Sequence, residues 1–113
     1  MQDAVEVIEY TDREGRSPFA RWFARLDPLA AAKVTRAAVR LEFGTVGDVK
    51  GVGAGVFELR IHFGPGYRIY FGQEGRERIV LLLGGSKARQ RLDIAAAHRY
   101  WADHKAWLRR GAP

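Results

Sequence analysis

The chain has 113 residues, enough for one domain (residues 1–113) that buries roughly two-thirds of its surface. It carries 19 Lys and Arg against 13 Asp and Glu, so its net charge of +6 favours an anionic partner such as nucleic acid or an acidic protein. The absence of cysteine excludes disulfides, thiol catalysis and thiolate zinc sites. No apolar run could span a bilayer and the start does not resemble a signal peptide, so we expect a cytoplasmic protein with no membrane partner.

The first half of the chain predicts a strand followed by two helices. Residues 5–10 form a short β-prone run. Ser17-Pro18 is a helix start, because serine caps helices and proline favours the first helical position. Asp27-Pro28 repeats that signal, and the second helix is expected to reach about Phe43, with Gly44 as its stop. The two helices predict a hairpin packed on a sheet.

The second half predicts three strands and a helix. Residues 45–55 contain four glycines and are expected to form a mobile loop. The predicted strands are Val56–Phe63, Tyr67–Gly72 and a third that ends in Gly84-Gly85-Ser86-Lys87, and a helix covers about Arg89 to Leu108. The order β-α-α-β-β-β-α predicts an α+β domain: a largely antiparallel four-stranded sheet, an N-terminal helical hairpin and a C-terminal helix.

The first two of these strands have one apolar and one polar face. The apolar residues alternate with a polar set made of Glu58, Arg60, His62, Arg68 and Tyr70. A three-residue loop, Gly64-Pro65-Gly66, keeps the two faces separate and predicts that His62 lies opposite Arg68 and Arg60 opposite Tyr70. This set of side chains could bind and cleave an RNA phosphodiester. The alternative is an ordinary solvated sheet face balanced by Glu58, with Tyr70 as a packed aromatic.

Positive charge also collects around the start of the last helix. Lys87, Arg89 and Arg91 lie at or just before it, where cations oppose the helix dipole. A phosphate site would explain them, and a solvated basic turn is the alternative. Lys50, in the glycine-rich segment, could reach a bound polyanion. His62, His98 and His104 are too scattered to predict a metal site, and we expect no cofactor.

Four segments resemble a known family. They are Glu58-Leu-Arg-Ile-His62, Gly64-Pro-Gly-Tyr-Arg-Ile-Tyr70, Leu82-Leu-Gly-Gly-Ser-Lys87 and Asp93-Ile-Ala-Ala-Ala-His98. The chain is similar to the HigB-like "addiction module killer protein" branch of the RelE/ParE superfamily of bacterial type II toxins. The resemblance implies a microbial-RNase-like α+β domain that cleaves mRNA without a metal, usually on the ribosome. It also implies a co-encoded antitoxin, often a helix-turn-helix protein. The chain would bind operator DNA only through this antitoxin.

The resemblance also implies roles for individual residues. Arg68 matches the strand arginine that many superfamily nucleases place at the scissile phosphate, and Arg60 and Lys87 match other basic positions. The substrate's 2′-hydroxyl would be the nucleophile, with His62 as the base or acid. Glu58 would be the alternative base, or the group that holds His62 or Arg60 in place. The last helix offers no match to the tyrosine that is catalytic in the founding members. The expected site thus has Arg68, Arg60, Lys87, His62 and Glu58 as catalytic residues and Lys50, Tyr70, Arg89 and Arg91 as RNA contacts.

Two other functions stay open from the sequence. A ParE-like protein would share the fold and inhibit DNA gyrase by binding, without cutting RNA. An inactive module would bind only its antitoxin. An inhibitor has no need of His62 beside two arginines, which favours the nuclease, an mRNA interferase that blocks translation.

Overall fold

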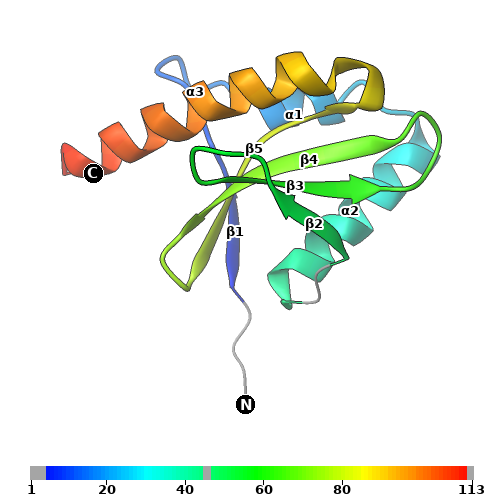
Figure 1. Cartoon of the computed structure of the whole chain (residues 1–113), viewed down its shortest axis with the longest axis horizontal. Helices are drawn as coiled ribbons and strands as arrows, with labels where there is room; N and C mark the ends of the chain where they lie inside the picture. The colour runs from blue at the N-terminus through cyan, green and yellow to red at the C-terminus, as the bar shows by residue number, and fades with distance from the viewer. Residues whose placement is uncertain (1–4, 45–46, 112–113) are drawn as a thin grey trace.

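The computed structural model describes residues 5–44 and 47–111 of the chain (Figure 1). Its elements in chain order are β1 (Glu6–Glu9), α1 (Pro18–Phe23), α2 (Pro28–Glu42), β2 (Asp48–Gly51), β3 (Val56–Ile61), β4 (Tyr67–Glu74), β5 (Arg78–Ser86), the short 3₁₀ turn η1 (Lys87–Arg89) and α3 (Gln90–Arg109). The domain is α+β, as predicted, with a helical hairpin before the strands β2 to β5 and a long helix after them.

The strands form one open sheet in the order β1-β5-β4-β3-β2. Neighbouring strands are antiparallel except β1, which runs parallel to β5. A parallel pair needs a crossover, and here the chain between β1 and β5 supplies both helices of the hairpin and three strands. The expected four-stranded sheet is wrong by one strand, because β2 adds to the outer edge of β3.

The two predicted helix starts are confirmed. Ser17 Oγ accepts a hydrogen bond from the Ala20 amide at 3.0 Å, and Asp27 Oδ1 accepts one from the Ala30 amide at 2.9 Å. Each cap satisfies a helix N-terminal amide that has no partner within the helix. Gly44 follows α2 with φ +73°, a backbone conformation that favours glycine.

The helical hairpin covers one face of the sheet. Phe19 of α1 and Val34 and Leu41 of α2 are buried there. They pack against inward side chains of the strands, namely Leu59, Ile69, Phe71, Ile79 and Leu81. This core uses the alternating apolar residues that the sequence predicts for the inner face.

The opposite face of the sheet also carries a core, which the sequence reading did not predict. Ala97 and Trp101 of α3 pack there against strand residues, and the buried set comprises Tyr10, Val56, Tyr70, Val80, Leu82, Ala97 and Trp101. Figure 1 shows α3 running along the sheet on the side away from α2. The polar face of β3 and β4, which could have been solvent-exposed, is therefore partly buried. The apolar stripe of α3 packs against it, and β5 is apolar on both faces.

β2 lies inside the segment that the sequence predicts to be a mobile loop. Asp48, Val49, Lys50 and Gly51 pair with Arg60, Leu59, Glu58 and Phe57 of β3. The loop prediction is wrong for these four residues, since pairing to an open strand edge compensates for their weak β-propensity. Residues 45–46, also in that segment, lie outside the described part of the chain.

The predicted register of the β3–β4 hairpin is wrong by two residues. The five residues 62–66 connect the strands, so that Arg60 lies opposite Arg68 and Glu58 opposite Tyr70. Within the connection the Gly66 amide donates to the Phe63 carbonyl at 3.0 Å. Gly64 and Gly66 both have positive φ, and the two-residue shift preserves the face of every side chain.

The glycine pair that ends β5 is explained by close packing on both faces of the sheet. A Cβ atom at Gly84 would overlap the Trp22 ring of α1, and one at Gly85 would overlap the Asp93 carboxyl of α3. Gly72 is likewise covered by Trp101. Glycine at positions 84 and 85 thus allows α1 on one face and α3 on the other to contact the backbone of β5 close to η1.

We expect Gly84→Ala to lower the free energy of unfolding by about 1–3 kcal/mol, because the added methyl group overpacks the contact with Trp22. Urea denaturation would measure the change. Gly47→Ala is the matched control, since a Cβ there meets no atom within 4 Å and should change stability by less than about 0.5 kcal/mol. Equal effects of the two substitutions would contradict this account.

Candidate functional site

A surface pocket of about 440 Å³ lies at the end of the β3–β4 hairpin. Residues 60–68 and Lys87 line it, and we call it the basic pocket. It brings together four predicted site residues, namely Arg60, His62, Arg68 and Lys87. Its described lining contains no acidic side chain. Two strands, their connection and the turn after β5 thus direct basic groups to one place.

Arg68 lies at the floor of the basic pocket, with 7% of its surface exposed. Its Nη1 donates to the Gly66 carbonyl at 3.0 Å, and its Nε is 3.5 Å from Glu58 Oε2. That Nε is buried and makes no hydrogen bond within the described part of the chain. The guanidinium is therefore held in place by Gly66 and Glu58 in the lining of the basic pocket.

Glu58 is fully buried and lies at the centre of the basic groups. Its carboxylate accepts hydrogen bonds from Gln90 Nε2 at 2.8 Å, Tyr70 Oη at 3.1 Å and Arg60 Nε at 3.3 Å. Burial alone would raise its pKa, but these hydrogen bonds and the charge of Arg68 outweigh burial and lower the pKa. Glu58 is an ionised anchor that holds Arg60, which is one of its two expected roles, and its burial leaves it inaccessible to a substrate as the alternative base.

Glu58 also explains an unusual cross-strand pair. Arg60 and Arg68 lie directly opposite each other on β3 and β4, an arrangement that is destabilising for like charges. The Glu58 carboxylate contacts both guanidiniums, at 3.3 Å and 3.5 Å. One buried anion thus holds two arginines on the same face.

Tyr70 has no exposed surface, so the expectation that it contacts RNA is wrong. Its hydroxyl donates to Glu58, and burial, together with the Glu58 charge, raises its pKa above the ordinary value. The sequence allowed this outcome as the alternative of a packed aromatic. Tyr70 belongs to the core beneath α3 and supports the site from below.

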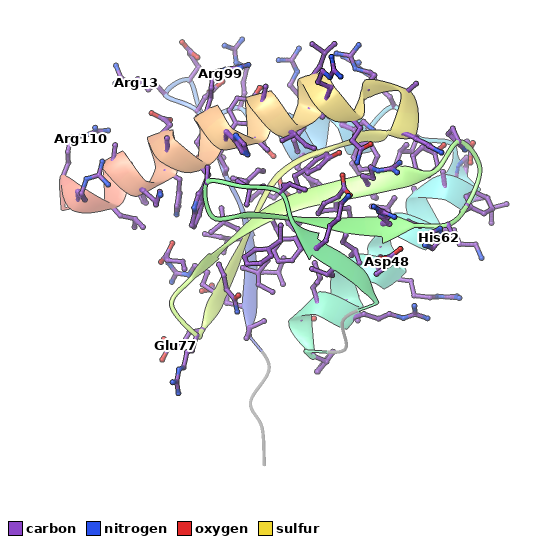
Figure 2. All side chains as sticks on the ribbon, in the orientation of Figure 1. Arg13, Asp48, His62, Glu77, Arg99 and Arg110 are labelled. Atoms are coloured by element: carbon purple, nitrogen blue, oxygen red, sulfur yellow. The ribbon has the colours of Figure 1, made fainter. Side chains whose placement is uncertain are left out.

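His62 is an exposed ionisable group of the basic pocket, with 75% of its side chain accessible. Its Nε2 lies 2.9 Å from Asp48 Oδ2, and Figure 2 shows the two side chains next to each other. Asp48 also lies 3.9 Å from Arg60 Nη1. A carboxylate partner orients the imidazole and fixes which nitrogen carries its proton. Sequence analysis missed Asp48, although the alternation of Asp48 and Lys50 around Val49 is a short strand pattern.

The remaining predicted RNA contacts are placed differently. Lys50 lies on β2 with its Nζ 4.0 Å from Glu58 Oε1, on the same face as Arg60. Arg89 lines another pocket of about 480 Å³, on the α1 side of η1, and Arg91 is exposed on α3. Neither of these two arginines lines the basic pocket.

Asp93 is the acidic residue in the first turn of α3, close to those cations. It is buried, its Oδ2 has no hydrogen-bond partner in the described structure, and Arg89 Nε is 3.9 Å from its Oδ1. Burial raises its pKa, and the charge of Arg89 lowers it by less. Its proximity to the helix N-terminus offsets part of the burial cost.

The other histidines have structural contacts. His98 Nε2 lies 2.9 Å from the Val52 carbonyl, and His104 Nε2 lies 2.8 Å from Glu74 Oε1 while its ring stacks on Trp101. Residues 5–44 and 47–111 contain no cluster of three or more His, Asp or Glu side chains arranged for a metal ion. Over the same residues, no helix has the length and hydropathy needed to cross a lipid bilayer.

The geometry gives the basic pocket a definite chemical capability. Arg68 and Arg60 offer planar guanidiniums, and Lys87 adds a third cation from the turn after β5. The imidazole of His62 can donate or accept a proton and lies against the Asp48 carboxylate. This combination can bind an oxyanion and transfer a proton beside it.

No protein-family model matches the sequence. The chain is 44% identical over 80 residues to a protein from Haemophilus influenzae that is named "uncharacterized protein". The alignment covers 70% of this chain and 81% of that protein. At this identity and coverage the chain belongs to the same family as the H. influenzae protein.

Proposed function

We propose that the protein is a toxin of a type II toxin–antitoxin system that cleaves mRNA in the basic pocket. The observation that carries the proposal is the buried guanidinium of Arg68, held by Glu58 and Gly66 beside Arg60, Lys87 and an exposed histidine. A protein that needed only a soluble sheet surface gains nothing from burying an incompletely satisfied cation. The sequence resemblance to the HigB-like branch of the RelE/ParE superfamily points to the same chemistry.

In the proposed mechanism the 2′-hydroxyl of the RNA attacks the adjacent phosphorus and the bond from phosphorus to the 5′-oxygen breaks. Arg68 and Arg60 bind the non-bridging oxygens, on which negative charge develops, and Lys87 adds a point charge. His62 either takes the proton of the 2′-hydroxyl or gives one to the leaving 5′-oxygen, solvent water exchanges the proton at the other oxygen, and Asp48 holds the His62 ring in position. Glu58 keeps the two arginines in place and touches no substrate atom.

The proposed family assignment extends to the fold and the partners. A helical hairpin, an open mostly antiparallel sheet and a C-terminal helix are what the RelE/ParE resemblance implies, and the parallel β1–β5 pair is compatible with it. The corresponding partners are mRNA on the ribosome and a co-encoded antitoxin in the cytoplasm. A net charge of +6 supports binding to either an RNA or an acidic protein segment.

Two parallel assays with the purified protein distinguish this proposal from gyrase inhibition. The first adds the protein to translating ribosomes and maps breaks in the mRNA, and the second measures supercoiling by DNA gyrase. The proposal expects new mRNA ends in the first assay and unchanged supercoiling in the second. Blocked supercoiling without mRNA breaks would instead support the ParE-like function, and activity in neither assay would support the inactive binding module.

A further inference from the structure

A second depression, of about 330 Å³, continues from the basic pocket toward α2. The two depressions share three lining residues, namely Arg60, Ile61 and His62. The second one is bounded on its far side by Lys33, Arg36 and Arg40 of α2, which we call the α2 strip. A ligand that occupied the basic pocket could therefore extend along one groove onto α2 without leaving the surface.

The α2 strip is a regular row of cations. Positions 33, 36 and 40 lie at i, i+3 and i+7 on one side of the helix, so the row spans about 10 Å at 1.5 Å per residue. None of the three forms an ion pair with an acidic side chain in the described structure. Lys33 Nζ lies 5.4 Å from the centre of the Phe63 ring, which places this lysine beside the hairpin connection.

The charge of the groove is not balanced locally. Asp48 is its acidic lining residue, and that carboxylate already contacts His62 at 2.9 Å and Arg60 at 3.9 Å. Like charges three and four residues apart on a helix repel one another. An anionic ligand along the strip would attract all three cations and offset that repulsion.

We propose that the α2 strip binds the backbone phosphates that adjoin the scissile phosphate, so that one RNA strand runs from the basic pocket across Arg60 and His62 onto α2. This proposal rests on the proposed function, because that function places the scissile phosphate in the basic pocket. An RNA strand fits better than an acidic protein segment, because a single polyanion then occupies both halves of a continuous groove whose other end is built for a phosphate.

The test compares two triple variants that remove the same charge. The first is Lys33→Gln, Arg36→Gln, Arg40→Gln. The control is Arg99→Gln, Arg109→Gln, Arg110→Gln, which changes exposed arginines in the middle of α3, at its last residue and directly after it. Figure 2 shows Arg99 and Arg110 away from His62 and Asp48. Thermal unfolding checks that both variants are folded. The measurement is the affinity for a single-stranded oligoribonucleotide, by fluorescence anisotropy over a salt series.

The α2 variant should reduce the slope of log affinity against log salt by about 2, since each lost phosphate contact removes about 0.7 for a single strand. The control variant should leave the slope of the wild type unchanged. Equal slopes for the two variants, or wild-type binding that does not respond to salt, would overturn the proposal. Polyglutamate is tested in the same way, and its affinity should not fall more in the α2 variant than in the control variant. A loss of affinity in the α2 variant that is confined to polyglutamate would assign the α2 strip to an acidic protein and would also overturn the proposal.

RNA cleavage is measured separately with the same proteins. In the α2 variant KM should rise for a long RNA and stay unchanged for a dinucleotide, while kcat changes little, because the strip acts by binding. If the wild type cleaves RNA but the α2 variant has the same salt slope as the wild type, the proposed function is retained and the RNA path along α2 is rejected. If the α2 variant has the smaller salt slope but no protein cleaves RNA, the RNA path along α2 is retained and the nuclease function is rejected.

Discussion

Arg68→Ala should reduce mRNA cleavage on the order of 100-fold or more, the effect of removing one preorganised donor from a site where charge develops. Arg68 is buried in the lining of the basic pocket and held there by the Gly66 carbonyl and by Glu58. Its loss removes both the positive charge and a planar pair of donors. Cleavage rates on translating ribosomes, at saturating protein, measure the effect.

Two further variants control this measurement. Arg76→Ala removes one exposed arginine from the turn between β4 and β5 and should cleave at the wild-type rate. Arg68→Lys keeps the buried charge but loses the fork of donors, so it should remain folded and still be strongly impaired. A folded Arg68→Ala protein that cleaves as fast as Arg76→Ala would rule out the basic pocket as the catalytic site.

Glu58→Ala should lower the free energy of unfolding by about 3–5 kcal/mol, the usual cost of removing one partner from a buried ion pair. The substitution leaves the buried Arg68 without its anion and the Tyr70 hydroxyl without its acceptor. Denaturant unfolding at neutral pH measures the loss. Glu42→Ala, which removes a less buried carboxylate at the end of α2, should cost much less. Similar losses in the two variants would contradict the central place of Glu58.

Acid should remove the contribution of Glu58. Its pKa is lower in the folded protein than in the unfolded chain, so the ionised form adds stability at pH values above the unfolded pKa. That contribution is lost as the pH falls through the folded pKa. The difference in unfolding free energy between the wild type and Glu58→Gln should therefore shrink on acidification. A difference that grows on acidification would mean that burial, and not the surrounding donors, governs this carboxyl.

Sequence patterns predicted the elements that depend on local chemistry. The serine–proline and aspartate–proline helix starts need only a few neighbouring residues, and both lie where expected. The long α3 and the strands β3 to β5 follow from apolar periodicity in the same way. β2 escaped prediction because its alternation covers only four residues inside a glycine-rich segment, and their strand conformation depends on the open edge of β3.

The site was predicted in part for a similar reason. Alternation assigned the polar residues of β3 and β4 to one face but could not fix the register, because a shift of two residues leaves every face unchanged. It also could not show which part of that face α3 covers. Glu58 and Tyr70 are therefore interior, whereas Arg60 and His62 stay accessible next to the nearly buried Arg68.

The division between buried and accessible groups has a functional consequence. Glu58, Tyr70 and Gln90 form a hydrogen-bonded support beneath the two arginines. A network of satisfied buried polar groups restricts side-chain motion, so the guanidiniums need little reorganisation when a phosphate arrives. We expect this rigidity, and not additional contacts with the substrate, to be the contribution of α3 to activity.

The chemical identity of the RNA ends produced by the purified protein tests the account most directly. Attack by the 2′-hydroxyl in the basic pocket predicts a 2′,3′-cyclic phosphate on one product and a 5′-hydroxyl on the other, both lost in Arg68→Ala. Products with a 5′-phosphate, or intact mRNA on translating ribosomes at every protein concentration, would contradict it.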